Sequence, residues 1–128
     1  MNPVLILAIA VGGGLGSVVR HYVITAASGL WGQNFPYGTL LVNVLGSFII
    51  GALMEITAQK WQVSLETRAF LVTGCLGGFT TFSAFSFDVL KLVDTNHYLS
   101  AFLYVFLSVG LSLAAIFMAV YLIRGVFA

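Results

Sequence analysis

The sequence has 128 residues and a net charge of +1; 60% of the residues are hydrophobic and 7% are charged, against about 25% in an average soluble domain. A soluble protein this short cannot bury so much apolar surface, which indicates a membrane protein with no soluble domain, and the absence of a basic tract excludes nucleic acid as a partner. The single cysteine, Cys75, excludes an intrachain disulfide, and we expect it to be a small buried side chain.

Four apolar runs are long enough to cross a bilayer, because a spanning helix needs about 20 apolar residues. The first run follows Asn2, a good N-cap, and Pro3, which suits the first helical position, and it is expected to stop before Ser28 and Gly29. No basic segment precedes it, which predicts a retained helix and not a cleaved signal peptide. The spans are predicted at about residues 3–27, 36–59, 65–93 and 97–124 of one transmembrane domain that covers residues 1–128.

The later spans have boundary signals of their own. Asn34 and Pro36 are expected to open the second span, and Ser64 the third. Asn96 is expected to cap the fourth span, which should stop at Gly125.

The third span is too long and too rich in glycine for one simple helix. It would be about 43 Å long at 1.5 Å per residue, whereas the hydrocarbon core is about 30 Å thick. Its middle, residues 74–81, contains three glycines and two threonines, which predicts a break near the bilayer midplane. Irregular backbone at that depth lines a cavity or is buried in protein, and transport proteins place ion sites there. The alternative is a continuous helix in which Gly74 and Gly78 allow close packing.

The distribution of positive charge and the spacing of small residues indicate how the helices could insert and associate. Positive residues are almost balanced between the two sides of the membrane, with Lys60, Arg68 and Arg124 on the side of the termini and Arg20 and Lys91 on the other. So little bias permits insertion in both orientations, and hence an antiparallel homodimer, although folding contacts could also select one orientation. Small residues four positions apart predict close helix contacts at Gly12-xxx-Gly16, Ser47-xxx-Gly51 and Gly110-xxx-Ala114.

Enzymatic chemistry is not expected, because no carboxylate pair, metal-ligand cluster or nucleophile–base pair falls within one span. His21 and His97 lie near helix ends, which favours interface anchoring. Polar residues inside the spans instead recur every four positions, as Thr39, Asn43 and Ser47 on the second helix and Tyr104, Ser108 and Ser112 on the fourth. Each set shares one helical face and forms a ladder of neutral hydrogen-bond donors, which suits an anion that must shed water but also suits bonds between helices.

Two phenylalanines and one arginine are further candidates. Phe82 and Phe85 share a face just beyond the expected break, and phenylalanine edges carry partial positive charge that a small anion can meet. The alternative for both rings is contact with lipid or core. Arg20 is expected near the far interface, where it anchors the helix or draws anions into a vestibule.

Three segments on three predicted helices resemble the Fluc (CrcB-type) fluoride channels, in the order and length typical of that family. They are GSVVR at 16–20, GTLLVN at 38–43 and GGFTTFSAFS at 77–86. One departure is Ala84, where the family more often has threonine.

The resemblance implies a fluoride-selective channel that gives passive fluoride efflux and fluoride resistance from a bacterial inner membrane. It implies an all-α fold of four transmembrane helices with a broken third helix, assembled as an antiparallel dual-topology homodimer with two pores. Arg20 would stand in the vestibule, and a structural sodium ion at the dimer interface would bind the backbone carbonyls of Gly77 and Thr80. The pore residues would be Phe82, Phe85, Asn43, Tyr104, Ser108, Ser112, Thr39 and Ser83.

Two other functions remain open from the residues. A small proton-coupled multidrug exporter has similar length and often similar topology, but it needs a membrane-embedded carboxylate. The first helix here has no acidic residue, and all four acids lie near span ends. A non-conducting assembly subunit is the second alternative, and it predicts that replacing Asn43 or Phe82 affects only folding.

Overall fold

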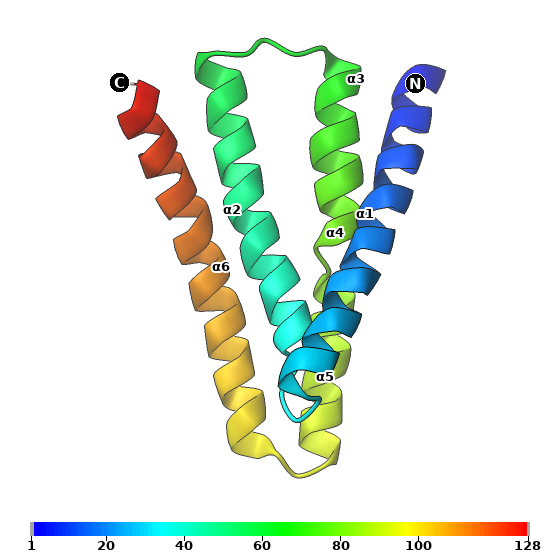
Figure 1. Ribbon diagram of the computed structural model, residues 1–128, viewed down its shortest axis with the longest axis vertical. Helices are drawn as coiled ribbons and strands as arrows, with labels where there is room; N and C mark the ends of the chain where they lie inside the picture. The colour runs from blue at the N-terminus through cyan, green and yellow to red at the C-terminus, as the bar shows by residue number, and fades with distance from the viewer. Residues whose placement is uncertain (1, 128) are drawn as a thin grey trace.

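The computed structural model describes residues 2–127, which form four long helical spans. Helix α1 covers Pro3–Trp31, α2 covers Tyr37–Gln59, an interrupted third span covers Leu65–Asp94, and α6 covers Tyr98–Phe127. Each is long and apolar enough to cross a membrane. Both termini and the α2–α3 loop lie at one end, and the helices converge towards the other (Figure 1). The prediction of an all-α protein with four spanning helices is confirmed.

The third span consists of four helical pieces. Helix α3 covers Leu65–Arg68, the π-helix η1 covers Ala69–Leu76, α4 covers Gly77–Phe79 and α5 covers Phe82–Asp94. Thr80 and Thr81 between α4 and α5 are extended, with ψ values of 156° and 119°. The predicted break is therefore present, at the last two residues of the segment 74–81.

The glycines before the break are helical and serve close packing. A Cβ at Gly74 would lie 2.9 Å from the Cα of Gly12, and one at Gly78 would collide with the backbone of Gly13. Gly16 meets the carbonyl of Cys75 in the same way. The close packing at Gly74 and Gly78 is thus confirmed, whereas the continuous helix of that alternative is wrong, because the span is interrupted at Thr80 and Thr81. Cys75 is only partly buried.

Two helix ends differ from expectation in a way that backbone geometry explains. Helix α1 continues through Ser28 and Gly29 to Trp31, because the left-handed residue that ends it is Gly32, at φ 82°. Gly125 likewise lies inside α6, which runs to Phe127. The N-caps at Asn2 and Ser64 are confirmed, since their side chains accept hydrogen bonds from Val4 and Thr67.

The start of α2 and the α5–α6 turn also correct the expected caps. Pro36 precedes α2 without a side-chain cap, and α2 begins at Tyr37. Asn96 has φ 63° and closes α5 instead of opening α6. Its N–H donates to the Val93 carbonyl (3.0 Å), and the His97 N–H donates to the Leu92 carbonyl (2.8 Å). This pair of bonds is the Schellman arrangement, in which asparagine tolerates the left-handed position.

Helices α2 and α6 pack directly on each other. A Cβ at Gly51 would lie 2.8 Å from the Ile116 carbonyl oxygen, so the glycine permits this approach. Arg124 and Glu55 form an ion pair of 2.7 Å between the same helices, near the end with the termini. Gly110 in contrast has open space around it, so the predicted Gly110-xxx-Ala114 contact is not made between helices of one subunit.

Candidate functional site

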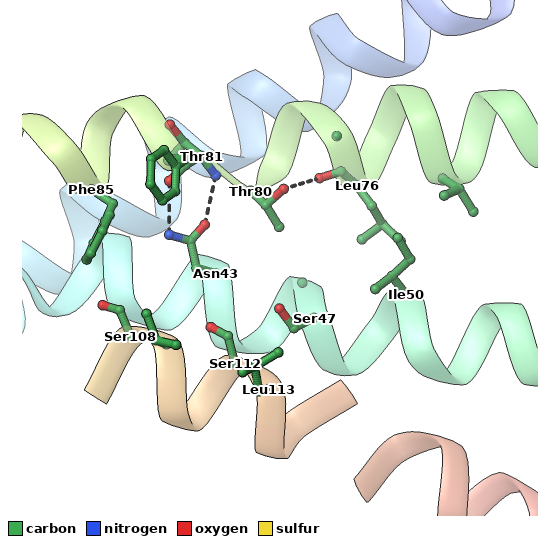
Figure 2. A pocket seen from close by; sticks show the side chains of 15 residues that line it. Asn43, Ser47, Ile50, Leu76, Thr80, Thr81, Phe85, Ser108, Ser112 and Leu113 are labelled. Atoms are coloured by element: carbon green, nitrogen blue, oxygen red, sulfur yellow. Dashed lines mark hydrogen bonds between the residues drawn. The ribbon is translucent and has the colours of Figure 1, made fainter. Parts of the chain in front are cut away.

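A cavity of about 480 Å³ lies between α2, the broken third span and α6, and it opens to the surface of the subunit. Figure 2 shows Asn43 and Ser47 facing it from α2, Ser108 and Ser112 from α6, and Thr80, Thr81 and Phe85 from the region of the break. We call this cavity the groove. Its lining residues are Asn43, Gly46, Ser47, Ile50, Val72, Leu76, Gly77, Thr80, Thr81, Phe82, Phe85, Ser108, Val109, Ser112 and Leu113.

Asn43 joins α2 to the break. Its Oδ1 accepts a hydrogen bond from the Thr81 N–H (2.7 Å), and its Nδ2 donates to the Thr81 carbonyl (3.0 Å; Figure 2). The Thr81 side chain in turn accepts from the N–H of Ala84 (3.1 Å) and so caps α5. The N–H and carbonyl of Thr81 and the N–H of Ala84 are therefore satisfied by side chains, as buried backbone requires.

These bonds release two carbonyl groups from the helical pattern. In an unbroken helix, the N–H groups of Thr81 and Ala84 would donate to the carbonyls of Gly77 and Thr80, four residues earlier. Both N–H groups are instead taken by the side chains of Asn43 and Thr81. Gly77 and Thr80 also line the groove. Gly77 and Thr80, the two residues expected to bind a cation through their backbones, are thus among the residues whose carbonyls lose a helical bond at the break.

Two serines offer unused hydroxyl groups to the groove. Among residues 2–127, the side-chain polar atoms that are buried without a hydrogen-bond partner are the Oγ atoms of Ser108 and Ser112. Buried hydroxyls normally find a partner, because leaving one unsatisfied costs about 1–3 kcal/mol. Both serines line the groove, so an unpaired hydrogen-bonding capacity is concentrated there.

The two phenylalanines have very different environments. Phe85 is 9% exposed and lies between Phe82 and Tyr104, with ring centroids 5.4 Å and 5.1 Å away. Phe82 is 76% exposed on the subunit surface. Both rings line the groove; Phe85 is a buried core residue, and Phe82 is exposed.

The remaining polar candidates do not line the groove. Tyr104 is completely buried, and its hydroxyl donates to Asp88 Oδ2 at 2.9 Å. Thr39 is 4% exposed on the first turn of α2. Ser83 is exposed, with its hydroxyl 3.3 Å from that of Thr81, and Arg20 is partly buried on α1.

Sequence reasoning missed the parts played by Thr81 and Asp88. Thr81 directly precedes α5, where a threonine is a favourable N-cap, and this is a readable signal. Asp88 follows Phe85 by three residues and therefore shares its face of α5. Asp88 also lines a second cavity, of about 250 Å³, together with Lys91 and His97.

The site offers neutral donors, ring edges and backbone oxygens. Within residues 2–127, no three His, Cys, Asp or Glu side chains come close enough to hold a metal ion together. Hydroxyl and amide groups with phenylalanine edges suit a small anion, and carbonyl oxygens suit a hard cation such as sodium.

Known proteins resemble this chain over most of its length. The profile of the family described as "CrcB-like protein, Camphor Resistance (CrcB)" matches residues 7–120. The chain is 47% identical over 119 residues to a "Fluoride-specific ion channel FluC" of Rhizobium etli, covering 93% of this chain and 95% of the relative. Proteins of the same name are 49% identical in Agrobacterium fabrum, covering 95% and 98%, and 45% identical in Roseiflexus sp., covering 88% and 91%.

Proposed function

The chain belongs to the CrcB-like family, and from this membership we infer that it is a subunit of a fluoride-specific ion channel and not an enzyme. The relatives that carry this name match nearly the whole chain, so the inference concerns the entire transmembrane domain. The structural observation that best supports it is the pair of unpartnered hydroxyls, Ser108 and Ser112, in the groove.

The groove is the proposed fluoride path. Fluoride leaves water only if donors replace its hydration shell, and neutral donors bind it without holding it too tightly to leave. The second N–H of Asn43 Nδ2 and the hydroxyls of Ser108 and Ser112 would supply these donors. The ring edges of Phe82 and Phe85 would meet the ion beside them.

The other predicted pore residues would serve the approach to the groove. Tyr104 donates the hydrogen bond of its hydroxyl to Asp88, so in this arrangement that hydroxyl is not available as a donor to an anion. Thr39 and Ser83 would extend the polar path at either side of Asn43. Arg20 would raise the local anion concentration in the vestibule, as a fixed positive charge does at a channel mouth.

The functional unit is proposed to be an antiparallel, dual-topology homodimer. The groove opens to the surface of one subunit, so a second copy would be needed to enclose an ion there. The nearly balanced positive charges permit both orientations, and Gly110 offers a close approach that the subunit does not use itself. Cysteine labelling from each side of the membrane tests this, because both orientations should appear in one population.

A structural sodium ion at the dimer interface fits the backbone of the break. The N–H groups of Thr81 and Ala84 donate to side chains and not to the carbonyls of Gly77 and Thr80. Those carbonyl oxygens are ligands of the kind that a hard cation prefers. When bound, the ion would supply positive charge that ties the two breaks together.

The protein is a multi-pass membrane protein, and the bacterial inner membrane is its proposed location. Neutral HF that enters from an acidic medium ionises in the neutral cytoplasm and leaves fluoride trapped there. A passive channel would let that fluoride return down its gradient and would protect the cell.

Ion efflux from liposomes is the direct test. Purified protein should release fluoride rapidly and chloride hardly at all, and Phe82→Ile or Asn43→Asp should reduce fluoride efflux while the dimer persists. Folded dimers without fluoride efflux would contradict the channel. Proton-coupled export of organic cations would then be measured, because Asp88 is a partly buried carboxylate on which such an exporter could depend.

A further inference from the structure

The side-chain amide of Asn43 bonds to the backbone of Thr81 as another peptide group would. A single side chain satisfies both peptide groups of Thr81, accepting from its N–H at 2.7 Å and donating to its carbonyl at 3.0 Å. Thr81 is 7% exposed, so water does not readily replace either bond. We propose that Asn43 is the positioning residue that holds the third span open at the break, and that it thereby keeps the Gly77 carbonyl available to a cation.

We call the pair of hydrogen bonds between Asn43 and Thr81 the clamp. The hydrogen of the Thr81 N–H connects the clamp to the cation site. The Thr81 N–H is the natural donor to the Gly77 carbonyl of a continuous helix, and it is directed to Asn43 Oδ1 instead. If Asn43 releases it, Thr80 can turn from its extended conformation, with ψ at 156°, to the helical one, and the Thr81 N–H then bonds to the Gly77 carbonyl. The Thr80 carbonyl is protected separately, because the Thr81 hydroxyl takes the Ala84 N–H.

The same amide also faces the groove. Nδ2 has two hydrogens, and only one is needed for the Thr81 carbonyl, so the second can be donated to an anion in the groove. Asn43 is therefore shared by the two ion sites, with its oxygen serving the cation side and its nitrogen the anion side. This inference rests on the cation site and the fluoride path proposed above.

Two substitutions separate the two functions of the amide. Asn43→Asp keeps an oxygen that can accept from Thr81 but loses the amide donors, whereas Asn43→Leu loses both. Ser47→Ala is the matched control, because Ser47 lines the groove one turn further along α2 and takes no part in the Asn43–Thr81 pair. The purified dimers are compared by the sodium-induced rise in unfolding temperature, by hydrogen exchange of a peptide covering residues 77–84 in sodium-free buffer, and by fluoride efflux.

In Asn43→Leu, sodium should no longer raise the unfolding temperature. The Thr81 amide hydrogen should exchange about tenfold faster, because its buried hydrogen bond is lost. Asn43→Asp should keep more of the sodium effect and of the exchange protection than Asn43→Leu, because one oxygen still accepts from the Thr81 N–H, and it should lose fluoride efflux. Ser47→Ala should resemble the unaltered protein in sodium response and exchange. If Asn43→Leu does not yield folded protein, Asn43→Ser makes the same comparison, since its side chain is too short to reach both groups of Thr81.

The outcomes test the clamp separately from the proposed cation site and the proposed fluoride path. Unchanged exchange and an unchanged sodium effect in Asn43→Leu would overturn the clamp. If the unaltered protein shows no sodium effect, the cation site is overturned, and faster exchange in Asn43→Leu would still support the clamp. Equal loss of the sodium effect in Asn43→Asp and Asn43→Leu would overturn the division of labour between oxygen and nitrogen.

Discussion

The hydroxyl of Tyr104, which has no exposed surface, donates a 2.9 Å hydrogen bond to the carboxylate of Asp88. This bond ties α6 to α5 beside the buried cluster of Phe85, Leu92, Ala101 and Tyr104. It places the single partly buried acid of α5 next to the aromatic end of the proposed fluoride path.

Replacing Asp88 should destabilise the subunit by removing that acceptor. Asp88→Ala leaves the Tyr104 hydroxyl buried and unpaired, which should cost about 1–3 kcal/mol of unfolding free energy. Asp88→Asn keeps an acceptor oxygen and should lose much less. Thermal unfolding in detergent measures both, and equal losses would show that the charge of Asp88 matters more than its hydrogen bond.

Replacing the groove serines should affect conduction without lowering stability. Ser108→Ala and Ser112→Ala remove buried hydroxyls that have no partner within the subunit, so the unfolding temperature should stay the same or rise, and it should not fall. Fluoride efflux should fall roughly three- to tenfold, because an ion loses one donor along its path. Ser100→Ala on the same helix is the control and should leave efflux intact; a similar decrease there would argue against a specific role for the groove.

Alanine substitutions of Phe85 and Phe82 should have different effects on stability but similar effects on conduction. Phe85→Ala removes a buried ring with two aromatic neighbours and should cost about 3–5 kcal/mol, whereas Phe82→Ala should cost little because that ring is 76% exposed. Fluoride efflux should decrease in both. Phe87→Ala, an exposed ring on α5 that does not line the groove, controls for exposed phenylalanines in general. Normal efflux in folded Phe82→Ala would remove Phe82 from the path.

The glycine contacts between α1 and the third span should tolerate no side chain. Gly16→Ala places a Cβ against the Cys75 carbonyl, which is backbone and cannot move aside, so folded protein should be largely lost. Gly14→Ala, where the space is open, should be neutral or slightly stabilising, because alanine favours helix over glycine by about 1 kcal/mol. The yield of monodisperse protein and its unfolding temperature give the comparison. A well-folded Gly16→Ala protein would mean that the helices can separate.

A charge bias should reveal the insertion preference. Gln33→Lys with Asn34→Lys adds two positive charges to the α1–α2 loop and should orient that loop towards the cytoplasm in most copies. Because an antiparallel dimer needs both orientations, fluoride efflux from cells should fall when this variant is produced alone. Coexpression with a copy biased the opposite way should restore it, and full activity of the single biased variant would contradict the antiparallel arrangement.

The number and order of the spans follow from the sequence, because hydropathy and bilayer thickness act on each segment locally. The composition of residues 74–81 likewise predicted the break. Local composition did not distinguish its two causes: the glycines pack against α1, and the interruption falls on Thr80 and Thr81. The end of α1 was misplaced for a similar reason, since Gly29 and Gly32 look alike in sequence and only Gly32 takes a left-handed conformation.

Only the tertiary structure decided which polar residues are free and which are used. The four-residue spacing put Asn43, Ser108 and Ser112 on polar faces, but it left open whether they bond to other helices or face an ion. The fold shows Asn43 bonded to Thr81, 38 residues away, and leaves the two serine hydroxyls unpaired within the subunit. A hydrogen bond depends on the distance between atoms of separate helices, and no property of either segment alone determines that distance.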